Sequence, residues 1–286
     1  MVEASIIITT YNRPDLLLKR SLRSAFKQVF KDYEIIVVDD ASTEKYPEIS
    51  GIKYIKHERN KGLAAARNTG IRAAQGRYIS CLDDDNELLP NFLTETINGF
   101  GHNPFIDAVG VGRIIQGKEI ADYVVPKISK WTSIDWGWLI KKEVFNHIQY
   151  DEQCHANEDA DFGIRFFKQF NARIIDKVLC IAYDCDDPKQ SLSYPTEREL
   201  AGMEYFFNKN YLEYNDTREL WHLYRLMGRK FYRGGHRKRG INYFWQGFKI
   251  YPTFRTFLNF VFILFGWFIY DKYMTVEERI GSKLRK

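Results

Sequence analysis

The first hundred residues alternate short apolar runs with segments of helical periodicity, and this alternation restricts the fold more than any other feature. The apolar runs that predict strands are Ser5–Ile8, Glu34–Val38, Ile52–Lys56 and Arg77–Leu82. Helical patterns begin at Pro14 and again at Gly62, where an Ala-rich stretch continues to Ala74. Strands that alternate with helices predict an α/β fold with a doubly wound, mostly parallel sheet.

Polar side chains follow three of these predicted strands directly. They are Thr9–Asn12, Asp39–Asp40 and Asp83–Asp85. In a parallel sheet the carboxyl ends of the strands lie at one edge, where ligands bind, so the three clusters are expected to form one site.

The triplet Asp83–Asp85 is the most specific of these clusters. One aspartate would be enough to cap the next helix, and three adjacent carboxylates repel one another. A divalent cation such as Mg²⁺ or Mn²⁺ relieves that repulsion and commonly shares its carboxylate ligands with substrate phosphates. The first and third side chains of an extended triplet point to the same side. The triplet therefore predicts a metal-dependent nucleotide site.

Two further features each allow two interpretations when only the residues are considered. Asn157–Asp161 opens a helical pattern, where the helix dipole favours acids, but a carboxylate there also suits a general base. Arg67 lies on the Ala-rich helix. Helical arginines are commonly solvated, yet this one is expected near the ends of the aspartate-bearing strands, where it could meet a diphosphate.

The order and spacing of these segments resemble the inverting family-2 glycosyltransferases of GT-A fold. The matching stretches are SIIITTYNRPDLL, EIIVVDDAS, NKGLAAARNTGIRAAQGRYISCLDDDN, GWLIKKEVF and NEDADFGIR, which together cover about residues 4–170. The resemblance implies metal-dependent transfer of a sugar, with inversion in a single displacement, from a UDP-linked donor. The acceptor would be a hydroxyl of a glycan or of a lipid-linked molecule of the surface-polysaccharide or lipooligosaccharide type.

The resemblance also implies roles for single donor-side positions. Thr9, Tyr11, Asn12, Asp39 and Asp40 would hold the uridine, Arg67 would approach the base or the phosphates, Asp83 would touch the ribose, and Asp84 and chiefly Asp85 would serve the Mg²⁺ or Mn²⁺ ion. The family often has glycine where this chain has Ala41, and proline where it has Thr9. A histidine common in the family before a Ser-Leu-Ser stretch has no counterpart in residues 183–193.

On the acceptor side, the resemblance makes Asp159 the catalytic base and Glu158 its neighbour, which would contact the acceptor or orient the loop. Trp136 and Trp138 are predicted to stack on a sugar ring of the acceptor, with a place in the core as the alternative.

Residues 1–200 are predicted to form the catalytic domain, with a donor half in 1–100 and an acceptor half in 101–200. Residues 201–286 are predicted to form a basic, amphipathic helical extension. Its apolar stretch Phe257–Tyr270 is too short to span a bilayer. With basic residues before it, this stretch is expected to lie on the inner leaflet of a membrane. A buried helix or a homodimer interface is the alternative.

Cysteine content, the N-terminal residues and net charge bear on the cellular location and the partners of the protein. Four cysteines without a paired framework indicate a reduced environment, and MVEASIIITT lacks the basic start of a signal peptide, so we expect a cytoplasmic protein peripheral to the inner membrane. A net charge of +5 gives no argument for nucleic acid. Two other functions remain. A nucleotidyltransferase would want a glycine-rich phosphate loop, which Thr9–Arg13 lacks, and a non-catalytic membrane-bound partner of another transferase would not need Asp85 and Asp159.

Overall fold

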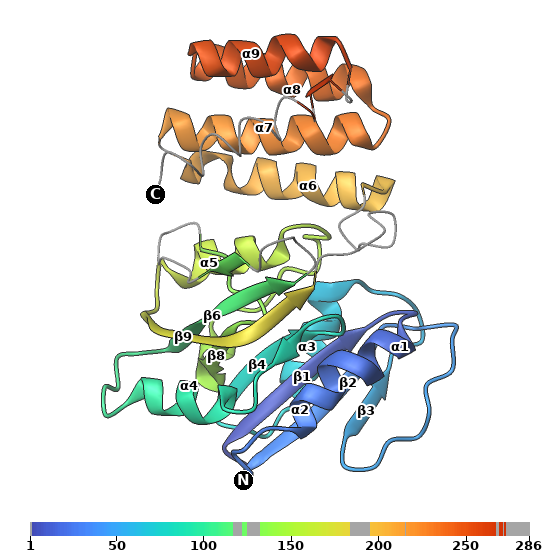
Figure 1. Cartoon of the computed structure of the whole chain (residues 1–286), viewed down its shortest axis with the longest axis vertical. Helices are drawn as coiled ribbons and strands as arrows, with labels where there is room; N and C mark the ends of the chain where they lie inside the picture. The colour runs from blue at the N-terminus through green and yellow to red at the C-terminus, as the bar shows by residue number, and fades with distance from the viewer. Residues whose placement is uncertain are drawn as a thin grey trace. The chain divides into compact units, whose positions relative to one another are not determined.

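The computed structural model describes residues 2–116, 122–124, 132–183, 195–214, 216–266, 269–270 and 272. The chain divides into two compact units, residues 1–190 and residues 191–286 (Figure 1). The first unit is a mixed α/β layer structure, and the helices of the second unit follow it in sequence. Each unit is described by itself.

The first unit is built on one nine-stranded sheet. Its strands are β1 (Ala4–Thr10), β2 (Tyr33–Asp39), β3 (Lys53–Lys56), β4 (Tyr78–Asp83), β5 (Glu87–Leu88), β6 (Ala108–Gln116), β7 (Asp122–Val124), β8 (Trp138–Lys141) and β9 (Ala172–Tyr183). The order across the sheet is β3-β2-β1-β4-β8-β6-β9-β5, and β7 pairs with β6.

Four neighbouring strands confirm the parallel sheet predicted for the first hundred residues. β3, β2, β1 and β4 are all parallel, with β1 between β2 and β4. Beyond them β8 runs antiparallel to both β4 and β6, so β6 regains the direction of β4. The carboxyl ends of β1, β2, β4 and β6 therefore point the same way, and we call that side of the sheet its carboxyl edge.

Helices cover both faces of this sheet. They are α1 (Pro14–Leu16), a π-helical turn (Leu17–Ser21), α2 (Leu22–Phe26), α3 (Leu63–Ala73), α4 (Phe92–Phe100), a 3₁₀ turn (Lys142–Asn146) and α5 (Glu158–Phe166). Successive residues of β1 pack on opposite faces of the sheet. Ile6 and Ile8 pack with α2 and α4, and Ile7 packs with α3 and α5. Because β1 is apolar on both faces, it must lie in the middle of the sheet.

The second unit consists of α6 (Glu197–Asn210), a 3₁₀ turn (Tyr211–Glu213), α7 (Thr217–Arg233), α8 (Arg237–Ile250) and α9 (Phe254–Leu264). Thr196, Asp216 and Thr253 cap the N-termini of α6, α7 and α9 through their side-chain oxygens. α7 and α8 approach closely, since a Cβ on Gly240 would lie 2.8 Å from the carbonyl oxygen of Gly228.

The apolar stretch predicted at Phe257–Tyr270 is not one helix. α9 ends at Leu264, and Gly266 has a φ of +115°, which glycine adopts at no steric cost. Trp267 and Phe268 lie outside the described residues. Within the described ranges no helix combines the length and apolar character that crossing a membrane requires.

Candidate active site

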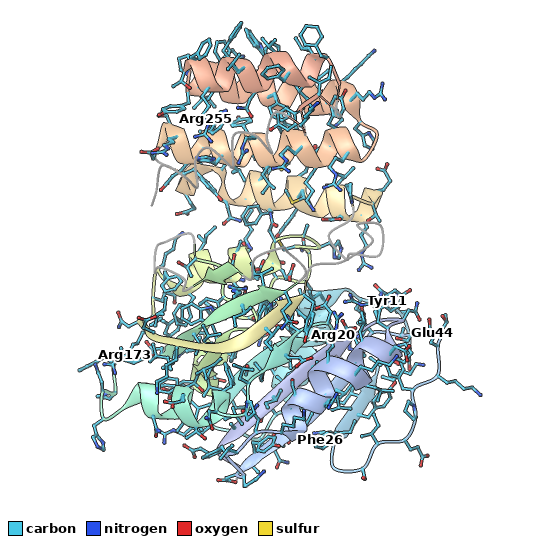
Figure 2. The ribbon with its side chains drawn as sticks, viewed as in Figure 1. Tyr11, Arg20, Phe26, Glu44, Arg173 and Arg255 are labelled. Carbon is cyan, nitrogen blue, oxygen red and sulfur yellow. The ribbon has the colours of Figure 1, made fainter. Side chains whose placement is uncertain are left out.

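The turn after β1 is tied to the turn after β2. Asn12 has a φ of +53°, and its amide oxygen accepts hydrogen bonds from the backbone N–H of Thr43 at 2.8 Å and from the Thr43 hydroxyl at 3.1 Å. The backbone N–H of Asn12 donates to Ser42 Oγ at 2.7 Å. Thr9 is buried beside this turn, whereas Tyr11 projects from it at the same edge as Arg20 and Glu44 (Figure 2). The turn therefore presents the Tyr11 ring at the carboxyl edge.

Asp39 is buried at the end of β2 and accepts bonds through both oxygens. The backbone N–H of Ser42 donates to Oδ1 at 2.8 Å, and the hydroxyl of Tyr54 donates to Oδ2 at 2.6 Å. Burial alone would raise the pKa of Asp39, but the bonds from Ser42 and Tyr54 and the ammonium of Lys56 outweigh it and hold that pKa below its usual value. Asp39 is therefore an anion fixed within the edge.

Asp40 holds the entrance to α3. Its carboxylate accepts bonds from the backbone N–H of Lys61 at 2.9 Å and of Gly62 at 2.7 Å, and His57 Nδ1 lies 2.7 Å from Oδ1. Ala41 follows with a φ of +67°, a strained value for an L-residue, at the position where the family often has glycine. The buried Asp40 thus shapes the loop that precedes Arg67.

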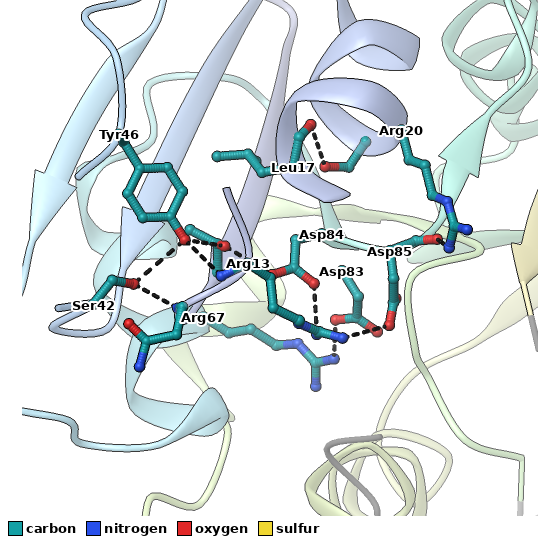
Figure 3. A network of polar contacts seen from close by, with 12 residues as sticks. Arg13, Leu17, Arg20, Ser42, Tyr46, Arg67, Asp83, Asp84 and Asp85 are labelled. Atoms are coloured by element: carbon teal, nitrogen blue, oxygen red, sulfur yellow. Dashed lines mark hydrogen bonds and ion pairs between the residues drawn. The ribbon is translucent and has the colours of Figure 1, made fainter. Parts of the chain in front are cut away.

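The three acids at and after the end of β4 lie close to Arg13, Arg20 and Arg67 (Figure 3). The side chain of Asp84 is fully buried, whereas those of Asp83 and Asp85 are 23% and 33% exposed; β4 ends at Asp83, so Asp84 and Asp85 belong to the turn that follows it. Thr10 Oγ1 donates to Asp84 at 2.7 Å, and the Arg13 guanidinium contacts Asp84 at 2.6 Å and Asp85 at 3.0 Å.

Burial and the neighbouring acids shift the pKa values within the triplet. Burial raises the pKa of Asp84 to about 7 even though Arg13 opposes the shift, and burial together with Asp83 raises the pKa of Asp85. Among the described residues no three metal-ligating side chains are grouped. Mg²⁺ is commonly held by one or two acids and completed by substrate phosphates and water. Asp83 and Asp85, which are partly exposed and pair with Arg67 and Arg13, are the acids that would hold such an ion.

Arg67 joins the triplet to the acceptor half. Its guanidinium contacts Asp83 at 2.9 Å and Glu158 at 2.7 Å, while the residue is only 2% exposed. Burial alone would lower the pKa of Arg67, but the two carboxylates raise it well above its ordinary value. We call the set Asp83–Arg67–Glu158 the Arg67 bridge. Its terminal nitrogens contact two carboxylates of the protein, and its predicted approach to the base or the phosphates stays a prediction.

Asp159 lies beside the Arg67 bridge in the first turn of α5. The preceding Asn157 has a φ of +57°, and the backbone N–H of Ala160 donates to Asp159 Oδ1 at 2.9 Å. Burial, Glu158 and Asp135 raise the pKa of Asp159 to about 7, against the opposing pull of Arg67. A carboxyl group with that pKa can accept a proton near neutral pH.

Comparison with known proteins identifies the chain. Residues 5–178 match the family described as glycosyl transferase family 2, which is more than half of the 286 residues. The chain belongs to glycosyltransferase family 2. It is 31% identical over 183 residues to an uncharacterised glycosyltransferase of Methanocaldococcus jannaschii, covering 56% of this chain and 63% of the relative.

Two further relatives extend the comparison. One is the GalNAc(5)-diNAcBac-PP-undecaprenol β-1,3-glucosyltransferase of Campylobacter jejuni, 29% identical over 194 residues, which are 59% of this chain and 61% of that protein. The crystal structure of S. aureus TarS 1–349 in complex with UDP-GlcNAc matches with a TM-score of 0.61 and 18% identity, over 87% of this chain and 82% of that one. The chain thus spans about three fifths of the two relatives compared by sequence, and TarS shows the same fold.

The structure also places the acceptor-side residues of this family-2 chain. Trp138 is buried in the core, where its ring packs against Gly110 and Phe167. This is the alternative predicted for it, and we propose no acceptor role for Trp138. Trp136 is also buried in a core cluster, which is the alternative predicted for it, and the guanidinium carbon of Arg113 is 5.0 Å from its ring centroid. Sequence reasoning missed Arg113 and Asp135, which pair at 2.7 Å near Asp159. The only sequence signal was an isolated acid in an aromatic stretch.

Proposed function

We propose that this chain transfers a sugar from a UDP-linked donor to a hydroxyl of a glycan or lipid-linked acceptor, with inversion. The Arg67 bridge carries the proposal, because one buried guanidinium contacts an acid of the donor half and an acid of the acceptor half. Family membership supports glycosyl transfer, and the fold shared with TarS, whose structure holds UDP-GlcNAc, supports a UDP-sugar donor. We assign the reaction to the first unit, residues 1–190.

The donor half would hold the nucleotide at the carboxyl edge. Tyr11 offers an exposed ring for the uracil, and Asp39 and Asp40 give the β2 turn a fixed shape around it. Asp83 and chiefly Asp85 would hold Mg²⁺ or Mn²⁺, which supplies positive charge to the departing nucleoside diphosphate. Arg13 already contacts Asp85 and would stabilise the same developing charge.

The acceptor half would supply the proton acceptor. In the proposed step Asp159 takes the proton of the acceptor hydroxyl while the oxygen bonds to the anomeric carbon. The bond from that carbon to the diphosphate oxygen breaks, and its electron pair leaves with UDP. A folded-state pKa of about 7 suits Asp159 to this work, and attack opposite to the leaving group inverts the configuration.

A thermal-shift panel tests the donor class. UDP-, GDP- and dTDP-sugars are compared with Mn²⁺ and with EDTA, and only UDP-sugars with the metal are expected to raise the melting temperature. Asp159→Asn should abolish transfer but keep the UDP-induced shift, whereas Asp85→Asn should lose the metal-dependent part of that shift. A shift of equal size with EDTA would contradict the metal, and loss of UDP binding in Asp159→Asn would contradict the base.

We propose further that the second unit associates with the cytoplasmic face of the inner membrane, where a lipid-linked acceptor would be reached. Residues 191–286 carry 17 Lys and Arg against 9 Asp and Glu, a net charge of +8, whereas residues 1–190 carry a net charge of −3. Exposed apolar side chains are found in α8 and α9, including Trp245, Phe254, Phe257 and Leu264. Basic residues beside exposed aromatic ones are typical of surfaces that bind anionic lipids.

Vesicle co-sedimentation tests this association. Binding to phosphatidylglycerol vesicles should exceed binding to phosphatidylcholine vesicles, should weaken as salt increases, and should fall further in Phe254→Glu/Phe257→Glu. Dimerisation that the double variant abolishes, without any vesicle binding, would instead support a homodimer interface on α9.

A further inference from the structure

The geometry points to a binding subsite for a neutral acceptor sugar at Asp135, held by Arg113 and supported by Trp136, directly beside Asp159. The inference rests on the proposed function and adds to it both a residue and a substrate class. Arg113 belongs to β6 and Asp135 to the segment 132–137 that leads into β8.

Arg113 and Asp135 lie on the side of the sheet toward its carboxyl edge. Ile79 of β4 pairs with Ile140, and Ile140 pairs with Ala108 of β6. Since β4 and β6 run in the same direction, Asp83 at the end of β4 and Arg113 on β6 both lie toward the carboxyl edge. One strand, β8, separates β4 from β6.

The β6 backbone is irregular where it presents Arg113. The pairing of β6 with β9 shifts register between Val111 and Gly112 and again between Gly112 and Arg113. Such irregularities redirect side chains and are common beside active sites. Arg113 Nη1 contacts Asp135 Oδ2 at 2.7 Å, and the backbone N–H of Gly137 donates to Asp135 Oδ1 at 3.3 Å. Asp135 is therefore held in one orientation.

The segment that carries Asp135 is fixed to the helix that carries the base. The backbone N–H of Ile134 donates to the carbonyl oxygen of Asp159 at 3.2 Å. A Cβ on Gly163 would lie only 2.0 Å from the carbonyl oxygen of Thr132, so α5 and the segment are in backbone contact. Asp135 thus keeps a constant position relative to Asp159, as a residue that orients an acceptor must.

The side chains of the pair remain partly open, 22% exposed for Arg113 and 14% for Asp135. A carboxylate with this exposure can accept hydrogen bonds from sugar hydroxyls, which are the donors that a neutral sugar offers. Asp135, Glu158 and Asp159 place three carboxylates here. Arg113 pairs with Asp135, and Arg67 pairs with both Glu158 and Asp83. The excess negative charge disfavours an anionic ring beside the base.

Saturation-transfer NMR on the full chain with UDP and Mg²⁺, which is diamagnetic, tests the subsite. The probes are neutral methyl hexosides and the anionic methyl glucuronide. Neutral glycosides are expected to bind the wild type, and Asp135→Asn is expected to weaken that binding by about tenfold or more. Arg113→Lys should weaken it less, because the charge remains. Glu143→Gln makes the same charge change at the opposite end of β8 and should leave binding unchanged.

UDP binding separates the possible failures. Asp135→Asn should retain the wild-type affinity for UDP-sugar, since the subsite serves the acceptor. Equal loss of donor binding would assign Asp135 to the donor sugar and overturn the inference. Unchanged glycoside binding in Asp135→Asn, preference for the glucuronide, or no binding of any neutral glycoside by UDP-loaded wild type would also overturn it. If the wild type fails to bind any UDP-sugar, it is the proposed function that fails.

Discussion

Replacing Arg67 with methionine tests the central feature of the site. The side chain is almost fully buried and contacts Asp83 at 2.9 Å and Glu158 at 2.7 Å. Methionine fills much of the same volume but leaves both carboxylates without their cation. Removing one partner of a buried ion pair costs about 3–5 kcal/mol. For a unit of 190 residues, each kcal/mol corresponds to about 2–4 °C, so the melting temperature should fall by about 6–20 °C.

Calorimetry or a circular-dichroism melt measures this change. Arg72→Met is the matched control, because Arg72 lies on the same helix, is 56% exposed and is 4.0 Å from Glu152. It should change stability by no more than about 0.5 kcal/mol. Combining Arg67→Met with Glu158→Gln should cost less than the sum of the single changes, since the second removes a stranded charge. A fall below about 2 °C in Arg67→Met, or strict additivity, would refute the bridge as an energetic link.

Three further results are expected. The kcat/KM for transfer should rise with pH to half its maximum near pH 7, where Asp159 is expected to titrate, and an apparent pKa near 4 would contradict the raised pKa of this base. Because that pKa is raised in the folded state, the protonated form is favoured by folding and stability is lost as pH rises from about 4 through 7. Melting curves of Asp159→Asn should therefore show a gain at pH 8 that disappears near pH 4. Gly163→Ala should destabilise the first unit by about 2–3 kcal/mol in urea unfolding, because the added Cβ meets backbone at Thr132, whereas a neutral effect would mean that the segment can shift away.

The strands of the donor half could be predicted from sequence because their signals are local. Each apolar run is followed directly by a polar cluster, and β1, β2, β3 and β4 appear within a few residues of their predicted bounds. The antiparallel insertion of β8 between β4 and β6 could not be predicted in this way, since strand order depends on contacts between distant segments.

In the site, too, local features could be predicted from sequence and contacts between distant residues could not. A polar cluster at the end of β4 could be predicted, although Asp84 and Asp85 lie in the turn after the strand and not in the extended triplet that was expected. The contact between Arg67 and Glu158 could not be predicted, because Glu158 lies 91 residues away in the chain. Trp138 is an aromatic residue whose burial only the packed sheet reveals, and Asp135 belongs to no motif. The roles of Thr9, Tyr11, Asn12 and Asp40 toward the nucleotide stay predictions, and residues 184–193 lie outside the described part of the chain.

The Arg67 bridge also limits how this protein can be recombined with its relatives. The arginine is encoded in the donor half and one of its two counter-charges in the acceptor half, 91 positions later. A chimera that joins this donor half to a foreign acceptor half keeps a neutralised core only if the foreign half brings a carboxylate to the position of Glu158. Any chimera joined between residues 84 and 157 to change specificity must therefore meet this one requirement. It can be read from a single position of the incoming sequence before any clone is made.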